Sequence, residues 1–140
     1  MRILQFHTDS HPYSLGKARR RVLNIIIQAG FGVETAECVQ VAVGEALTNV
    51  SEHAYGADVG PVSVKVVRSA GALTVAVSDD GRATVPPAVP RVPPTPSSYR
   101  GRGLYIVGRL MDDVAISVNT TGHGLTVRMT MRLQPRGAAA

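Results

Sequence analysis

Apolar residues recur at three- and four-residue intervals along the stretch 39–56, whose sequence is VQVAVGEALTNVSEHAYG. This spacing places them on one side of an α-helix and predicts that this side faces a hydrophobic core. The expected core positions are Val39, Val43, Ala46, Leu47, Val50 and Ala54. The stretch therefore belongs to the predicted central helix of the molecule, which follows the turn at Gly30-Phe31-Gly32 and ends at Tyr55-Gly56.

A row of polar residues runs beside this apolar side: Glu45, Asn49 and His53, each four positions after the last. Four residues make slightly more than one helical turn and rise about 6 Å, so Glu45 and Asn49 project to the same side. An asparagine oxygen can hold a hard cation such as Mg²⁺, and a nearby glutamate can orient or deprotonate a hydroxyl. Taken alone, the pair is better explained as a partly buried, hydrogen-bonded contact between helices than as a metal and base site. The motifs found later in the chain favour the site.

Alternating apolar and polar positions predict five strands in the rest of the chain. They cover residues 2–8, 61–69, 72–79, 113–119 and 125–133. A tight turn at Ala70-Gly71 joins the second and third strands into a hairpin, and the segment 120–124 joins the last two.

Two further helices are predicted, one from Ser14 to a stop at Gly30 and one over 104–111. The outer side of the first carries a basic cluster, namely Lys17, Arg19, Arg20 and Arg21. Such a cluster is either an ordinary solvated face or, in a narrower interpretation, a docking surface for an acidic partner.

The third predicted strand runs directly into Asp79-Asp80-Gly81-Arg82-Ala83. A carboxylate at a strand end, followed by glycine, can point into a cleft while the chain turns. There the carboxylate can accept a hydrogen bond from an exocyclic amine such as adenine N6. When this contact is buried, it strongly favours ligands that carry the amine over ligands that lack it. Asp-Asp-Gly is also common turn chemistry, so this motif is weak by itself.

Six of the nine prolines fall within 84–98, where neither a helix nor a strand is expected. This segment is either a lid over a ligand or a Pro-x-x-Pro ligand for the groove of another protein. Its position between two candidate site motifs favours the lid.

Two glycines, Gly101 and Gly103, stand immediately before the apolar helix 104–111. They leave backbone N–H groups accessible at a helix N-terminus, where the helix dipole favours anions. Arg100 and Arg102 add fixed positive charge. The motif therefore predicts a phosphate cradle.

Composition limits the function classes that remain. The 140 residues, 44% of them apolar, fit one globular domain. The net charge is +5, but apart from Arg19-Arg20-Arg21 the cations are dispersed, and there is no Trp, so we expect no nucleic-acid binding. The single cysteine, Cys38, excludes an intrachain disulfide and a multi-cysteine zinc site. The N-terminus does not resemble a signal peptide and no apolar run could span a bilayer, so a cytoplasmic protein without membrane contact is expected.

Taken together and in this order, the motifs resemble those of the histidine-kinase-like (GHKL) ATPase superfamily. Glu45-x-x-x-Asn49-x-x-x-His53-Ala54-Tyr55 resembles its N box, and Asp79-x-Gly81 its first glycine box. Gly101-x-Gly103-Leu104 resembles the second glycine box, and Gly124-x-Thr126 the closing strand. The resemblance implies the Bergerat fold: an α+β two-layer sandwich, with helices packed on one face of a mixed, mostly antiparallel sheet. It implies one domain over 1–135, an ATP lid over 84–98 and a disordered tail over 136–140.

Within that superfamily the chain is most similar to the anti-sigma factor serine/threonine kinases. The resemblance implies a protein serine kinase that uses Mg²⁺ and ATP to phosphorylate an anti-anti-sigma (STAS) partner. Asn49 would bind the Mg²⁺, Glu45 would orient or deprotonate the attacking hydroxyl, and Asp79 would read the adenine amine. A sigma factor is a second implied partner, with the Arg19–Arg21 helix as its candidate docking face. The oligomeric state stays open, with a homodimer as one option.

The remaining implied site residues surround the nucleotide. Thr126 would stand behind the adenine, and Gly81 would let the backbone approach the nucleotide. Backbone N–H groups of the second glycine box would contact the phosphates, and one arginine beside it would stabilise the γ-phosphate charge. These residues are Gly101, Gly103 and Leu104 for the N–H groups and Arg100 or Arg102 for the charge. His53 is also assigned to the nucleotide site.

Ala83 departs from the family pattern, because a second glycine normally stands at this place in the first glycine box. Ala83 is still assigned to the nucleotide site, but alanine does not readily adopt a positive φ, so lid closure or nucleotide affinity would differ. This departure keeps an alternative function open: a nucleotide-binding switch that sequesters a sigma factor with little or no kinase activity.

Overall fold

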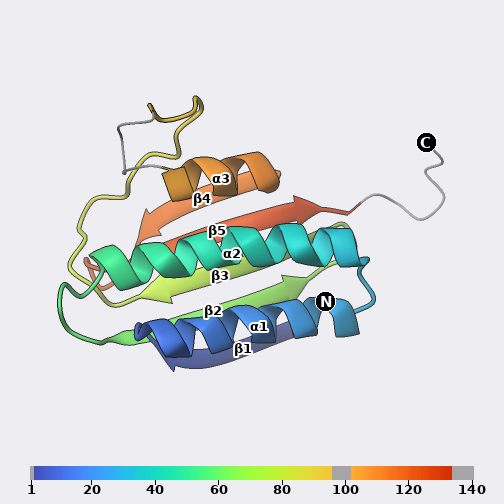
Figure 1. The fold of residues 1–140 in the computed structure, drawn as a ribbon, viewed down its shortest axis with the longest axis horizontal. Helices are drawn as coiled ribbons and strands as arrows, with labels where there is room; N and C mark the ends of the chain where they lie inside the picture. Colours follow the sequence, from blue (N-terminus) through green and yellow to red (C-terminus); the bar gives the residue numbers. More distant parts are fainter. Residues whose placement is uncertain (1, 96–101, 134–140) are drawn as a thin grey trace.

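The computed structural model describes residues 2–95 and 102–133. Five strands form one sheet in the order β1-β2-β3-β5-β4 (Figure 1). Their bounds are β1 Arg2–Asp9, β2 Pro61–Arg68, β3 Ala72–Asp79, β4 Asp113–Val118 and β5 Leu125–Arg132. The α+β two-layer arrangement is confirmed, but all four strand pairings are antiparallel, so the expected mixed sheet is wrong on that point.

Three helices cover one face of this sheet (Figure 1). They are α1 Pro12–Gln28, α2 Val33–His53 and α3 Arg102–Leu110. α2 lies between α1 and α3 and contacts both, which confirms that it is the central helix. All six of its predicted core positions are buried, with exposed fractions of 6% or less.

α1 begins at Pro12, before the predicted start at Ser14. His11 caps the helix, because its Nδ1 accepts a hydrogen bond from the N–H of Tyr13 at 3.1 Å. Proline suits this first position, since its missing N–H would have no helical partner there. The predicted start was late because histidine is an uncommon N-cap.

Strand alternation decides which side chains face the helices. Val64 of β2 pairs with Val77 of β3, Val75 pairs with Met129 of β5, and all four are buried beneath the helices. Residues that alternate with these along the strands, such as Ser78 and Thr126, therefore face the opposite, outer side of the sheet. The same alternation returns Asp79 to the helix-covered side.

The proline-rich segment has no helix or strand from residue 84 to 95, as predicted, and its last residues, 96–98, lie outside the described part. Val89 lies against α3, because a Cβ built on Gly108 would be 3.0 Å from Val89 Cγ1. The predicted tail, 136–140, also lies outside the described residues. Among the described residues, the longest helices are too polar or too short to cross a membrane.

Candidate functional site

Four chain segments that are distant in sequence meet at one end of the sheet (left in Figure 1). They are the end of α2, the end of β3, the start of α3 and the turn between β4 and β5. The N box, both glycine boxes and the closing strand all map to these segments. Residues 100 and 101 of the second glycine box lie outside the described residues, so Arg100 and Gly101 have no structural account.

The polar row of α2 faces the start of α3. Glu45 and Asn49 are half-buried, and Gly103 lies directly against them. A Cβ built on Gly103 would be 2.9 Å from Glu45 Oε2 and 3.6 Å from Asn49 Oδ1. Only a residue without a side chain fits here while Glu45 keeps its position. Leu104, which is buried, anchors the first turn of α3, and Arg102 is exposed.

Asp79 is held at the end of β3 by two backbone groups. Its Oδ1 accepts hydrogen bonds from the N–H of Gly81 at 2.8 Å and the N–H of Leu125 at 3.3 Å. The carboxylate is therefore fixed between its own turn and the start of β5. A fixed carboxylate on the helix-covered side can accept a hydrogen bond from a ligand amine with its other oxygen.

Gly81 is required by a close approach that the sequence did not reveal. A Cβ at this position would lie 2.4 Å from the carbonyl oxygen of Ala54, the residue that ends α2. The next N–H, of Arg82, donates to that same oxygen at 3.2 Å. The turn after Asp79 is thus attached to the end of the central helix.

The substitution of alanine for glycine at Ala83 causes no backbone strain. No described residue other than glycine has a positive φ, so the expected conflict at this position does not arise. The carbonyl of Ala83 accepts a hydrogen bond from the N–H of Gly124 at 2.9 Å. The start of the proline-rich segment is therefore joined to the turn between β4 and β5.

Tyr55 ends the N box motif, but sequence reasoning assigned it no role at the site. Its hydroxyl accepts a hydrogen bond from the N–H of Asp80 at 2.7 Å and donates to the carbonyl of Pro61. Burial, followed by the charges of Asp79 and Asp80, raises the pKa of Tyr55, although the hydrogen bond from Asp80 opposes this. Its ring lies so close to Gly60 that a Cβ there would be 2.3 Å from it. Tyr55 therefore joins the end of α2 to the loop after β3 and to the start of β2.

Thr126 supports the site indirectly. Its side chain lies on the outer side of the sheet, where its hydroxyl is 2.7 Å from Ser78 Oγ and donates to Asn119 Oδ1, also at 2.7 Å. Asn119 in turn donates from Nδ2 to the carbonyl of Asp79 at 2.7 Å. Thr126 is thus linked to Asp79 through Asn119, which the sequence did not single out.

The histidines near the site differ in their contacts. His53 is exposed on the last turn of α2, with its Nε2 3.6 Å from Glu52 Oε2. His123 is a turn residue, as its two neighbouring glycines predict, but its Nδ1 also lies 2.9 Å from the carbonyl oxygen of Gly81. Because a carbonyl only accepts, this nitrogen carries the proton.

The donor set is suited to Mg²⁺ and a phosphate chain. Glu45 and Asn49 offer oxygen atoms, the ligands that Mg²⁺ prefers. Gly103 and Leu104 belong to the first turn of α3, where backbone N–H groups and the helix dipole favour an anion. The glycine at position 103 leaves room between these two sets of groups, a space that a Cβ would fill.

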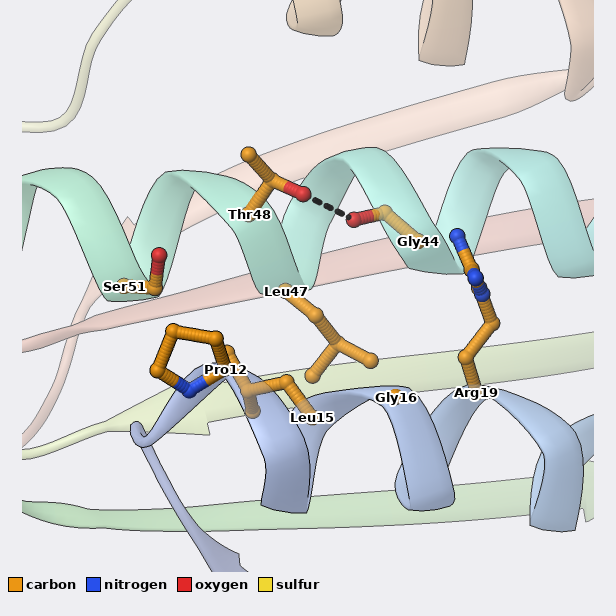
Figure 2. A pocket seen from close by; sticks show the side chains of 8 residues that line it. All are labelled: Pro12, Leu15, Gly16, Arg19, Gly44, Leu47, Thr48 and Ser51. Carbon is orange, nitrogen blue, oxygen red and sulfur yellow. Dashed lines mark hydrogen bonds between the residues drawn. The ribbon is translucent and has the colours of Figure 1, made fainter.

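A separate groove of about 160 Å³ lies between α1 and α2 (Figure 2). It is lined by Pro12, Leu15, Gly16, Arg19, Gly44, Leu47, Thr48 and Ser51, and so contains none of the predicted site residues. Arg19 extends along Gly44 at the edge of this groove, whereas Arg21 stacks on the ring of Phe6, 4.4 Å from its centre. The basic cluster of α1 is exposed, as predicted, but its arginines point in different directions.

Comparisons with known proteins agree with this geometry. The chain matches the family model of the histidine kinase-like ATPase domain over residues 8–131. Serine-protein kinases named RsbW from Bacillus cereus and Bacillus anthracis are 31% identical over 124 residues, covering 83% of this chain and 76% of theirs.

Two solved structures share the fold. A Mycobacterium tuberculosis protein with RsbU and RsbW domains aligns with a TM-score of 0.70 and 21% identity, over 96% of this chain and 34% of that one. The histidine kinase domain of a blue-light activated kinase from Erythrobacter litoralis aligns with a TM-score of 0.54 and 26% identity, over 86% of this chain and 60% of that one. The resemblance inferred from the four motifs is confirmed. The chain belongs to the histidine kinase-like ATPase domain family, and within it to the relatives of the serine-protein kinase RsbW.

Proposed function

We propose that this protein is an ATP-dependent protein serine kinase that phosphorylates an anti-anti-sigma (STAS) partner. One observation carries the proposal: Gly103 lies against Glu45 and Asn49, so a phosphate chain at the start of α3 would meet a metal ligand and a base together. The relatives named serine-protein kinase support the same reaction.

The adenine half of the site is assigned to the end of β3. Asp79 would accept a hydrogen bond from the adenine amine while its Oδ1 remains bonded to Gly81 and Leu125. Guanine carries an oxygen where adenine carries this amine, so it would face the carboxylate with an acceptor. This contact would make the site select adenine nucleotides.

The phosphate half is assigned to α2 and α3. Asn49 would bind Mg²⁺, whose charge neutralises the phosphates during transfer. Glu45 would accept the proton of the attacking serine hydroxyl, while the N–H groups of Gly103 and Leu104 and the charge of Arg102 hold the phosphates. Gly101 and Arg100 are assigned the same tasks from outside the described residues.

The partners are also part of the proposal. A sigma factor would dock on α1, where Arg19, Arg20 and Arg21 are exposed and available to acidic side chains. We place the protein in the cytoplasm, where sigma factors act, and keep a homodimer as the assembly to test.

Phosphate transfer from labelled ATP to a purified STAS protein tests the reaction. Glu45→Gln preserves the shape and removes the base, so transfer is expected to fall about 10²–10⁴-fold with little change in ATP affinity. Glu37→Gln is the matched control, because Glu37 is exposed on the same helix and is none of the assigned site residues. Transfer that survives Glu45→Gln would refute Glu45 as the base.

A nucleotide-binding switch that sequesters a sigma factor is the second candidate. One observation favours it: the bond from Gly124 N–H to Ala83 O and the contact of Val89 with α3 restrain the segment that would act as the lid. Tight ATP binding, a stable complex with a sigma factor and no phosphate on any STAS protein would establish the switch in place of the kinase.

A further inference from the structure

Asn119 occupies the point where the turn between β4 and β5 meets the loop after β3. It directly follows β4 and is half-buried. Its backbone closes the turn, because its N–H donates to Gly124 O and its carbonyl accepts from Gly122 N–H, both at 2.9 Å. Its side chain is not needed for this closure and is directed to another part of the chain.

Both ends of the Asn119 carboxamide are engaged. Nδ2 donates to Asp79 O and Oδ1 accepts from the Thr126 hydroxyl. A backbone carbonyl only accepts, so the atom facing Asp79 O must be the amide nitrogen. Since Thr126 gives its proton to Asn119, Ser78 must donate to Thr126, and a continuous chain of hydrogen bonds fixes the amide.

The fit around this amide is close. Gly124 has φ +81°, and a Cβ there would lie 2.6 Å from Asp79 O and 2.9 Å from Asn119 Nδ2. The turn also contacts the other end of the 79–83 loop, through Gly124 N–H and Ala83 O. The loop is therefore held at both ends by the β4–β5 turn, and Asn119 supplies the side-chain contact at the end that carries the Asp79 carboxylate.

We propose that Asn119 is a positioning residue for base recognition, which keeps the Asp79 carboxylate aimed at adenine by holding the Asp79 carbonyl. The inference rests on the proposed function, in which Asp79 reads the adenine amine. The carbonyl and the side chain of Asp79 share one Cα, so fixing the carbonyl restricts the direction of the carboxylate. An Asn119 that served only the β4–β5 turn would affect stability without affecting the choice of base.

Affinities for ADP and GDP, measured by calorimetry with Mg²⁺, separate these two roles. Asn119→Asp keeps the shape but presents an acceptor to Asp79 O, and Thr126→Val removes the hydroxyl that orients the amide. Any general effect of the added charge acts equally on both diphosphates and cancels in their ratio. Each variant is expected to lose about tenfold of the preference for ADP over GDP.

Thr121→Val is the matched control, because the Thr121 hydroxyl donates to His123 O within the same turn and is not bonded to the 79–83 loop. It should lower the melting temperature without changing the preference for ADP. If the preference for ADP over GDP fell in proportion to the melting temperature in all three variants, including the control, the proposal would be overturned. If Asn119→Asp does not fold, Thr126→Val decides the question.

Asp79→Asn separates this inference from the proposed function. If that variant keeps the ADP preference, Asp79 does not read adenine and the proposed function fails at this point. If it loses the preference while Asn119→Asp and Thr126→Val keep it, only the role of Asn119 is overturned.

Discussion

Gly103→Ala should slow phosphate transfer while leaving the fold intact. The new Cβ would lie 2.9 Å from Glu45 Oε2, whereas ordinary contacts begin at 3.4 Å, so the carboxylate must move by at least about 0.5 Å. Oε2 is at the end of a flexible side chain and can move without disturbing the backbone. Alanine also favours a helix over glycine by up to about 1 kcal/mol, so the free energy of unfolding should not fall.

The catalytic cost is much larger than this. A displacement of about 1 Å in a catalytic group costs roughly 10²-fold in rate, so a shift of at least about 0.5 Å should lower the rate constant for transfer to the STAS partner by about 10-fold to 10²-fold. The rate is measured in single-turnover assays at saturating ATP, with ADP affinity and the urea unfolding midpoint measured beside it. Combining Gly103→Ala with Glu45→Gln should add little further loss, because both changes disable the same carboxylate.

Gly108→Ala is the matched control on the same helix, where the new Cβ would meet Val89 and not Glu45. It should transfer phosphate at close to the rate of the unaltered protein. A Gly103→Ala variant with the unaltered rate would refute the placement of Glu45 beside the transferred phosphate.

Three further predictions concern the framework of the site. Gly81→Ala would bring a Cβ to 2.4 Å from the backbone of Ala54, which cannot move as a side chain can, so the free energy of unfolding in urea should fall by about 1–3 kcal/mol. Gly71→Ala is the control and should cause no such loss, because nothing lies within 4 Å of the new Cβ. Tyr55 has a raised pKa, so its contribution to stability is complete below pH 10 and is lost as the pH rises through the folded-state pKa. The melting temperature of the unaltered protein should therefore exceed that of Tyr55→Phe by less in alkali than at neutral pH. A difference that stays constant with pH would contradict this. Asp9 has a pKa lowered chiefly by the hydrogen bond from the His11 N–H and then by Ser14. Its stabilising effect should therefore hold above pH 3.8 and disappear as the pH falls below that value. If Asp9→Asn remained less stable than the unaltered protein in strong acid, the prediction would be contradicted.

The sequence predicted most of the fold because the elements follow simple periodicities. The six core positions of α2 and the two hairpins were recognisable from spacing and alternation alone. The starts of α1 and α3 were less accurate, since α1 is capped by His11 and α3 begins at Arg102, whereas α2 begins at Val33, directly after the predicted turn. The parallel pairing expected of the sheet does not occur among the described strands, because strand direction depends on long-range topology and not on local pattern.

The site was predicted in part. The motifs pointed to Glu45, Asn49, Asp79 and Gly103, whose residue types carry obvious chemistry. The roles of Tyr55 and Asn119 were missed because each acts through backbone groups that lie far away in sequence. The family pattern implied that Gly81 lets the backbone approach the nucleotide. In the structure, the atoms nearest to a Cβ at this position belong to the backbone of Ala54 at the end of α2. Such contacts become visible only when the segments are placed in space.

The location of the nucleotide is the central claim, and chemical-shift mapping of the backbone amides with Mg²⁺ and ADP tests it most directly. We predict the largest changes at Gly81, Gly103, Leu104 and Leu125, which surround one end of the sheet. Amides lining the α1–α2 groove, such as those of Gly16 and Gly44, should change little. Large changes confined to that groove, with the four site amides unmoved, would contradict the account.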